Sequence, residues 1–439
     1  MANALTLENV SPQLVKVVER AQREPEGRFH SLAHLIDVPA LERAYRRSRK
    51  DAAVGVDGVT KEQYGQELEA NLQDLHARMK AKRYRHQPIR RVHIPKEGGK
   101  TRPIGISAFE DKLVQDAVRE VLEAIYEQDF LDCSYGFRPK RSPHDAVRTL
   151  DRIVHRGEVS WILEADLVSF FDSLDRKKLK EMLGVRVADG SLLRLIGKCL
   201  HVGVLDGVEL STSESGTAQG SVLSPLLGNV YLHYVLDLWF EQEVKPRLRG
   251  RATLIRYADD FIIGFEEEED ARRVMEVLGK RLGRFGLTLH PDKTRLFPFR
   301  RPPAGQKSGK GPATFDFLGF TLYWARSRKG RWGMLCKTRS ASLRRLIHSV
   351  YVWCRRHRHS SVKDQHAALT RRIQGHFNYF GVSGNFRRLL LVIEQAKRTW
   401  YKWLCRRSQR KRLTWERFAD LLRDFPLPRP RITVRIWGS

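Results

Sequence analysis

The chain has 439 residues, 41% of them hydrophobic, so it can bury sizeable cores and is not disordered throughout. At roughly 150 residues per domain, this length suggests about three domains. Lysine and arginine outnumber aspartate and glutamate by 80 to 51, and the net charge of +29 favours a polyanionic partner, with nucleic acid first. Apolar runs are too short for a membrane span, the N-terminus does not read as a secretory signal, and no CxxC pair suggests a zinc site or a disulfide framework.

The predicted elements alternate between helices and short strands. Residues 1–50 read as a mostly polar, helical extension, and a glycine-containing turn at 55–59 leads into the main body. The acidic run 266–270 precedes a helix that continues to Arg284, and we interpret it as structural because carboxylates favour a helix N-terminus. Apolar periodicity predicts further helices at 112–126, 226–238, 343–356, 362–380 and 386–407, a buried strand at 161–167 and a breaker-rich linker at 300–313.

The last 100 residues carry most of the excess charge. Residues 340–439 contain 23 Lys/Arg and 5 Asp/Glu, so 23 − 5 = +18 of the +29 lies there, interleaved with tryptophan and tyrosine. Cations neutralise phosphates and aromatic faces can stack on unpaired bases. We expect most of these aromatics to be core residues, but the charge excess favours nucleic-acid binding by this region.

Three carboxylates stand in apolar surroundings. Asp166 lies near the end of the predicted strand, and Asp259-Asp260 separates two apolar stretches, 253–257 and 261–265, in the pattern of a hairpin. Adjacent carboxylates in a tight turn repel each other, and a divalent cation relieves that repulsion. Oxygen-rich sites favour Mg²⁺ or Mn²⁺, and two such ions can serve phosphoryl transfer. A solvent-facing turn is the alternative for Asp-Asp alone.

The flanking residues decide between these alternatives, because several motifs occur in the order found in one family. Tyr257-Ala-Asp-Asp260 resembles the catalytic box of reverse transcriptases, and Ala165-Asp-Leu-Val-Ser-Phe-Phe-Asp172 resembles their first catalytic strand. The segments 134–146 and 216–227 resemble blocks of group II intron-encoded enzymes specifically. The set is completed by 287–293 and 315–320, so the resemblance runs from about residue 55 to 322, and the basic tail is similar to the maturase (X) region.

This resemblance implies an α+β right-hand polymerase with fingers, a βαββαβ-type palm and a helical, basic thumb. The implied boundaries, given with the extension and tail, are 1–50 (extension), 51–155 (fingers), 156–335 (palm, with a 216–240 loop-helix and the 300–313 linker), 336–412 (thumb, or maturase domain) and 413–439 (short basic tail). No paired cysteines follow the maturase region, so we expect the C-terminal nuclease module of many relatives to be absent.

Roles carried over by position concern the reacting groups first. The resemblance implies that Asp166, Asp259 and Asp260 are catalytic and bind two Mg²⁺ ions, with Mn²⁺ as a substitute. It also implies dNTP-binding and template- or primer-binding residues. The dNTP contacts are Lys96, Arg102, Leu167, Phe171 and Gln219, and the template or primer contacts are Arg138, Leu318 and Gly319.

Several of these assignments have a structural alternative. Lys96 and Arg102 lie in a predicted β-hairpin, 94–103, that turns at Gly98-Gly99, and the spacing of its glycines excludes a P-loop. Phe171 matches a steric gate against the ribose 2′-hydroxyl, or else is a core phenylalanine. Arg138 is about as well explained by a structural ion pair. The loop of Gln219 departs from the family pattern at Ala218 and Ser221, which affects nucleotide affinity or fidelity rather than activity itself.

The leading hypothesis is an RNA-directed DNA polymerase that also binds its group II intron RNA as a maturase and copies it during retrohoming. The expected partners are that RNA, an RNA template with a DNA primer, target DNA, dNTPs and a second copy of the chain, with no membrane. We expect a bacterial cytoplasmic, nucleoid- or ribonucleoprotein-associated location. The alternatives are a splicing-only RNA-binding maturase and a domesticated or defence-associated (CRISPR-type) reverse transcriptase.

Overall fold

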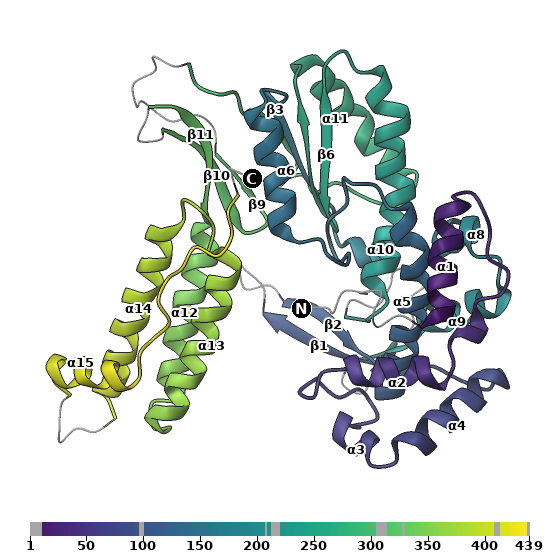
Figure 1. Ribbon diagram of the computed structural model, residues 1–439, viewed down its shortest axis with the longest axis horizontal. Helices are drawn as coiled ribbons and strands as arrows, with labels where there is room; N and C mark the ends of the chain where they lie inside the picture. The colour runs from purple at the N-terminus through teal and green to yellow at the C-terminus, as the bar shows by residue number, and fades with distance from the viewer. Residues whose placement is uncertain are drawn as a thin grey trace. The chain divides into compact units, whose positions relative to one another are not determined.

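The computed structural model describes residues 11–95, 101–206, 209–211, 220–303, 314–326, 330–407 and 413–436 (Figure 1). They form two compact units: residues 1–142, 163–263 and 268–296 belong to the first, and residues 143–162, 264–267 and 297–439 to the second. Helices and sheets are both well represented, which confirms the predicted α+β class. Within the described ranges, no helix combines the length and the apolar character needed to cross a membrane.

The N-terminal helices of the first unit pack on one long central helix. Leu14, Val17 and Ala21 form the buried face of α1, which the Ser11 side chain caps, and α1 and α2 both contact the central helix α5. The predicted helix at 112–126 is the middle of α5. The bounds are α1 Pro12–Arg23, η2 Ala33–Leu35, α2 Val38–Arg47, α3 Lys61–Gly65, α4 Leu68–Lys80 and α5 Phe109–Asp129.

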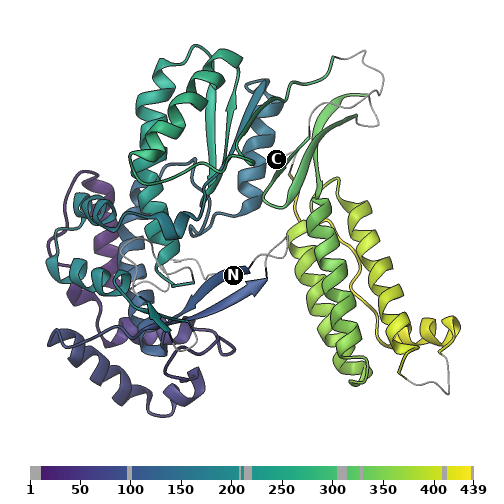
Figure 2. The same cartoon turned by 180° about the vertical axis from the view of Figure 1, so that it is seen from behind.

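A small sheet carries the predicted basic hairpin. Strands β1 and β2 pair in antiparallel fashion, with Ile94 opposite Arg102, and the sheet order is β2-β1-β4-β5. Figure 2 shows this hairpin from behind. The pairing confirms the predicted hairpin, whereas its turn at 98–99 lies outside the described residues. The bounds are β1 Ile89–Pro95, β2 Thr101–Ile106, β4 Val204–Asp206 and β5 Glu209–Ser211.

A second four-stranded sheet has the order β6-β7-β3-β8. In chain order, the strands of this sheet and the helices between them read β-α-β-β-α-β. The acidic run lies at the N-terminus of α11, as predicted. The bounds are β3 Trp161–Asp166, α7 Phe170–Ser173, α8 Arg176–Arg186, α9 Gly190–Leu200, β6 Ala252–Tyr257, β7 Asp260–Phe265, α11 Glu268–Gly283 and β8 Arg295–Pro298.

The helix predicted at 226–238 is longer than expected and changes its winding. It begins as α10 (Ser224–Leu232) and continues in two wider π-helical segments, η4 (His233–Asp237) and η5 (Trp239–Val244), before the short turn η6 (Lys245–Arg247). Almost all of α10 is buried, including polar Asn229. π-Helical turns inside helices frequently accompany functional sites, since they redirect side chains.

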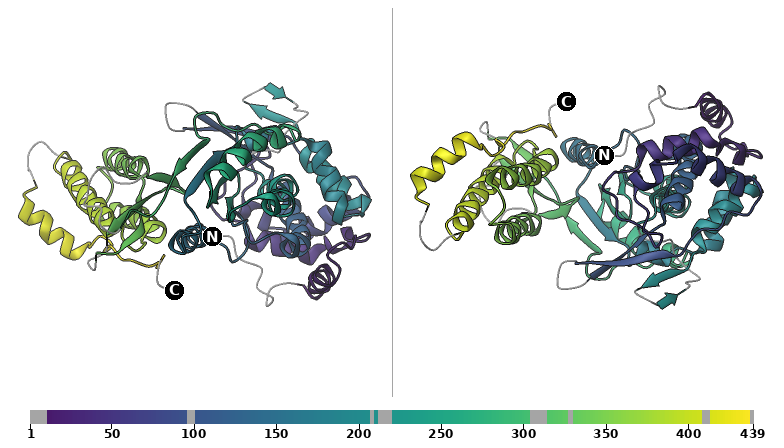
Figure 3. Two further views of the ribbon diagram at one scale, coloured as in Figure 1. Left: turned by 90° about the horizontal axis from the view of Figure 1, so that it is seen from above. Right: turned by 90° about the horizontal axis from the view of Figure 1, so that it is seen from below.

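The second unit combines a small sheet with a helical bundle. Its sheet has the order β11-β10-β9, and the helices α12, α13 and α14 lie side by side, with α15 near their end (Figure 1); Figure 3 views the bundle from above and below. All three predicted helices of this region are present, and α13 has the predicted bounds. The elements are α6 Pro143–His155, β9 Phe315–Phe317, β10 Phe320–Arg326, β11 Trp332–Thr338, α12 Ser340–Arg356, α13 Val362–Phe380, α14 Phe386–Leu404 and α15 Trp415–Asp424.

Most aromatics of the basic region are core residues, as expected. Trp400 is fully buried in the bundle, and its indole nitrogen donates a hydrogen bond to Gln365 Oε1 at 2.9 Å. Trp403 is buried in the same cluster, whereas Trp415 is half exposed. The cations of this region therefore lie on the outer faces of helices whose aromatic side chains hold the bundle together.

The buried His233 makes the free energy of unfolding depend on pH. Burial lowers its pKa from the ordinary 6.5 to about 4; Asp237 opposes this shift, while Arg256 and Arg138 add to it. Between about pH 6.5 and 4, His233 is therefore protonated in the unfolded chain but neutral in the folded one. The stability that comes from the neutral ring is complete above about pH 6.5, and up to about 3 kcal/mol is lost as the pH falls toward 4.

In His233→Leu, we expect the free energy of unfolding to decrease less than in wild type as the pH falls from 6.5 to 4. The exposed His359 provides the matched control, and His359→Leu should keep the wild-type profile. Urea unfolding between pH 4 and 7.5 measures both variants. Identical profiles for wild type and His233→Leu would contradict this prediction.

Candidate active site

The predicted hairpin places Asp259 in a two-residue connection. Strand β6 ends at Tyr257 and β7 begins at Asp260, so Ala258 and Asp259 form the turn. Ala258 has a φ of +57°, in the left-handed region that a residue with a Cβ adopts at a cost in energy. Asp166 is the last residue of β3, and β3 is the sheet neighbour of β7. Two remote segments therefore bring the three carboxylates to one part of the sheet.

The three carboxylates are close enough to repel one another. Burial, followed by the charges of Asp166, Asp259 and Glu164, raises the pKa of Asp260 to about 7. Burial also raises the pKa of Asp259, with Asp166 adding to the shift and the cations of Arg102 and Lys293 opposing it. Such clustering of negative charge in a partly buried site is characteristic of sites that work with a cation.

The donor set suits a divalent metal ion, although the carboxylates are not arranged around one point. Among the described residues, no group of three potential ligands is already gathered. Instead, the Asp166 carboxylate forms an ion pair with the Lys293 ammonium. Lys293 thus occupies the place of a counter-ion. Carboxylate oxygens are the ligands that Mg²⁺ and Mn²⁺ prefer, so the chemistry of the set fits those ions.

A buried ion pair holds the turn between β6 and β7 in place. Both Arg256 and Asp237 are fully buried, and the guanidinium donates to the two carboxylate oxygens at 2.7 and 2.6 Å. The same guanidinium donates to Asn229 Oδ1 at 2.9 Å and to the Ala258 carbonyl at 3.2 Å. Ser134 Oγ accepts a further bond at 2.8 Å. The ion pair thus fixes the residue that precedes Asp259.

The segment around Gly136 packs closely against this turn. A Cβ at Gly136 would stand 2.4 Å from the Ala258 nitrogen, so only glycine fits there. The amide of Asn229 donates to the Gly136 carbonyl at 2.7 Å. The Tyr135 nitrogen donates to the Arg256 carbonyl at 2.8 Å. The motif around Gly136, which the sequence linked to group II enzymes, therefore braces the Asp259 turn.

Three of the predicted nucleotide contacts, Arg102, Phe171 and Leu167, lie among the described residues of the first unit. Arg102, on β2, interacts electrostatically with Asp259 and with Asp172. Phe171 is half-buried on the short helix α7, 5.1 Å from the ring of buried Phe170, and both rings approach Gly228 of α10. Leu167 is buried, and its backbone forms an isolated antiparallel β-bridge with Leu289. Their roles toward a nucleotide stay predictions.

The remaining predicted contacts fall elsewhere. The Arg138 guanidinium pairs with Glu127 at 3.1 Å and donates to backbone carbonyls, so the structural ion pair named as its alternative is present. Leu318 and Gly319 form the left-handed turn between β9 and β10 in the second unit. Lys96 and Gln219 lie outside the described residues.

Sequence reasoning missed the residues that hold the site. Arg256 lies in the apolar stretch 253–257, Lys293 ends the segment 287–293, and Asp237 lies in the predicted helix 226–238, and none of them had a predicted role. The available signal was a charged residue within an otherwise apolar strand, since a buried arginine requires a partner. The partner could not be found in the same way, because Asp237 lies on a helix and its register against the strand depends on the π-helical winding.

Comparison with known proteins agrees with this site. The family described as reverse transcriptase (RNA-dependent DNA polymerase) matches residues 94–322, more than half of the chain. Protein YkfC of Escherichia coli (strain K12) is 34% identical over 358 residues, which cover 73% of this chain and 90% of YkfC. Group II intron-encoded protein LtrA of Lactococcus lactis subsp. cremoris is 39% identical over 209 residues, which cover 45% of this chain and 35% of LtrA.

The chain therefore belongs to the reverse transcriptase family. Within that family, it falls in the group of group II intron reverse transcriptases and maturases, as the motifs predicted; Nuclear intron maturase 1 of Arabidopsis thaliana is a further relative, 33% identical over 92 residues that cover 21% of this chain and 13% of that protein. The match to LtrA spans about a third of the length of LtrA, so properties of that whole protein do not transfer directly.

Proposed function

We propose that the chain is an RNA-directed DNA polymerase that uses two Mg²⁺ ions, for which Mn²⁺ can substitute. The observation that carries this proposal is the convergence of Asp166, Asp259 and Asp260, from remote strands, in one electrostatic cluster. In this proposal β1, β2 and the N-terminal helices form the fingers, the β6-β7-β3-β8 sheet is the palm, and α12–α14 form the thumb.

Each residue of the site has a task in strand extension. Asp166 and Asp259 would hold both ions, with Asp260 supporting them, and the bound ions would lower the pKa of the primer 3′-hydroxyl and neutralise the triphosphate. Arg102, with Lys96, would neutralise the incoming triphosphate. Lys293 would leave Asp166 when the metal ions bind.

We further propose that the chain binds a group II intron RNA and assists its splicing as a maturase. The basic faces of α12–α14 and the relatives' printed names support this extension. An RNA template with its DNA primer and target DNA complete the proposed nucleic-acid partners, and a second copy of the chain and a nucleoid-associated location remain proposals too.

Primer extension tests the polymerase directly. An RNA template with an annealed DNA primer, dNTPs and Mg²⁺ should give full-length DNA, and removal of the metal by EDTA should stop the reaction. RNA binding without extension would instead support a splicing-only protein. Sequencing of the RNA that copurifies with the protein tests the maturase part. An intron RNA that splices at low Mg²⁺ only with protein present is expected, whereas unrelated cellular RNA without a splicing effect would contradict it.

Phe171 provides a test of sugar selection. Its ring is half-buried between Phe170 and Gly228, so a smaller side chain opens space without removing a buried anchor. We expect Phe171→Val to raise the efficiency of ribonucleotide incorporation relative to dNTPs by about tenfold or more, since steric exclusion of one hydroxyl is a moderate sieve. Phe170→Leu serves as the core control. Unchanged sugar discrimination in Phe171→Val would show that Phe171 is only a core residue.

A further inference from the structure

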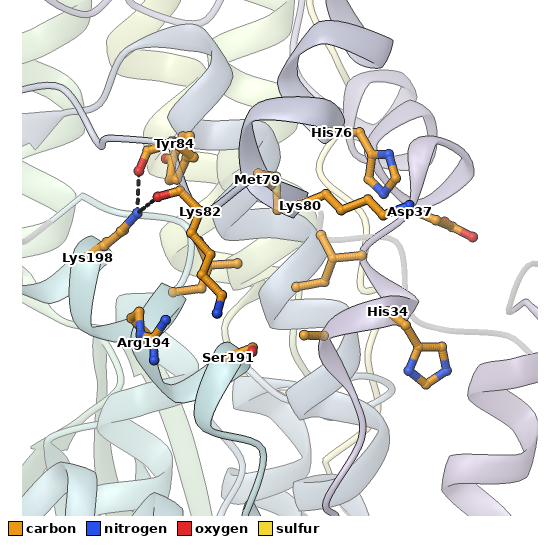
Figure 4. A pocket seen from close by; sticks show the side chains of 13 residues that line it. His34, Asp37, His76, Met79, Lys80, Lys82, Tyr84, Ser191, Arg194 and Lys198 are labelled. Carbon is orange, nitrogen blue, oxygen red and sulfur yellow. Dashed lines mark hydrogen bonds between the residues drawn. The ribbon is translucent and has the colours of Figure 1, made fainter.

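A cavity in the first unit lies apart from every residue assigned above. Its volume is about 440 Å³, within the roughly 300–1,000 Å³ of small-ligand sites. Three separate parts of the chain line it: the stretch from η2 to the start of α2, the end of α4 with the residues that follow, and one face of α9 (Figure 4). None of these residues belongs to the candidate active site.

The cavity has an apolar floor and a cationic rim. Ile36, Met79 and Leu195 contribute to the floor, and Lys82 and Arg194 are exposed at the rim. In Figure 4 the Lys82 side chain points toward the α9 residues Arg194 and Ser191. Such a combination suits a ligand with a weakly polar body and an attached negative charge, and a nucleotide has both.

The charges of the rim are available to a ligand. Lys82 and Arg194 form no ion pair with another described residue. Asp37 contributes the sole carboxylate among the lining residues, and its Oδ1 accepts a bond from the Ala40 nitrogen at 2.8 Å as the cap of α2. Lys198, by contrast, donates to the Lys82 and Tyr84 carbonyls and so holds the cavity wall in place.

An adjoining cavity extends the site along α9. This second cavity, of about 510 Å³, shares Arg194 and Lys198 with the first and adds Arg85, Lys180 and His201, with no carboxylate among its lining residues. A mononucleotide has one phosphate group, which the cations of the first cavity would hold, so it leaves the second cavity without a ligand. A strand has a next phosphate, and cations that track a backbone are the usual means of holding one.

We propose that this pair of cavities captures an unpaired nucleotide of an RNA strand. The base would lie against Ile36, Met79 and Leu195, its phosphate would meet Lys82 and Arg194, and the neighbouring phosphate would lie in the second cavity. The proposal deepens the RNA-binding part of the proposed function and rests on it, since it assumes that the chain binds RNA.

Photo-crosslinking to the full-length protein tests the proposal. A short unstructured RNA that carries 4-thiouridine should form crosslinks within residues 76–84 and 191–198, mapped by mass spectrometry. The double variant Lys82→Glu/Arg194→Glu should reduce these crosslinks by about tenfold or more. It should also lower the slope of log K against log salt by about two, one for each lost phosphate contact. Lys16→Glu, an exposed cation on α1, is the matched control and should keep wild-type behaviour.

Three results would overturn the proposal. One is a wild-type crosslink map that includes other segments but not these two. Another is displacement of the pocket crosslinks by free UMP at equal nucleotide concentration, which would assign the cavity to a mononucleotide. The third is retention of the crosslinks in the folded double variant. Primer extension by the wild type, run in parallel, reports on the polymerase separately, so failure of the pocket and failure of the proposed activity remain distinguishable.

Discussion

Asp259→Ala should abolish primer extension while leaving RNA affinity within about twofold of wild type. The carboxylate lies in the turn between β6 and β7, where it faces the charges of Asp166 and Asp260. Its removal takes away a proposed metal ligand that acts on the reacting atoms, so we expect a loss of at least about a hundredfold in kcat. The side chain is not part of a hydrophobic core, and removal of a mutually repelling charge costs no stability.

The control for this variant is Asp51→Ala, which removes an exposed carboxylate of the same unit whose one ion pair with a described residue is that with Arg49. Extension by Asp51→Ala should match wild type. Filter binding of labelled RNA and thermal unfolding complete the comparison. If Asp259→Ala lost RNA binding and extension together, or unfolded at a markedly lower temperature, Asp259 would be a folding residue and the catalytic assignment would be wrong.

Asp237→Ala should lower both the free energy of unfolding and the rate of extension. It leaves the guanidinium of Arg256 buried without its counter-ion, which costs about 3–5 kcal/mol. The same guanidinium donates to the Ala258 carbonyl, so the turn that carries Asp259 should lose its support as well. Denaturant unfolding and primer extension measure the two effects separately.

A double variant separates support of the turn from stability alone. Arg256→Met/Asp237→Leu removes both charges, and such replacements often restore the stability that the single change loses. Recovered stability with kcat still reduced by tenfold or more would show that the hydrogen bond to Ala258 positions the turn. Full recovery of both would show that Arg256 and Asp237 serve stability only.

Local patterns in the sequence predicted most elements of this fold. The β6–β7 hairpin and the helix Val362–Phe380 were predictable, because each depends on periodicity and on breakers within its own segment. The N-terminal helices were read as a polar extension, yet α1 packs on α5 through an apolar face of Leu14, Val17 and Ala21. The spacing of these three residues marks an apolar helix face within the segment, but it does not say which distant helix that face packs on.

In the candidate site, too, the local features could be predicted and the long-range contacts could not. Its carboxylates could be chosen from motif order, and strand adjacency then brought them together. The contacts that hold these carboxylates could not be predicted from the sequence. The partners of Arg256 come from segments about 20 to 120 residues away, and their meeting depends on the winding of α10 and η4. The basic cavity was equally hidden, since three separate parts of the chain build it and none carries a motif.

The ion pair between Asp166 and Lys293 implies that Lys293 competes with cations at the proposed metal site. A tethered ammonium offsets part of the negative charge of the carboxylates, so a divalent ion that binds Asp166 must displace it and gains less on binding than it would from a bare carboxylate. A nucleotide that arrives with its own triphosphate charge offers the released ammonium a new partner. Metal occupancy and nucleotide arrival would then be thermodynamically linked, and the enzyme would hold its ions tightly only when a monomer is ready to be joined.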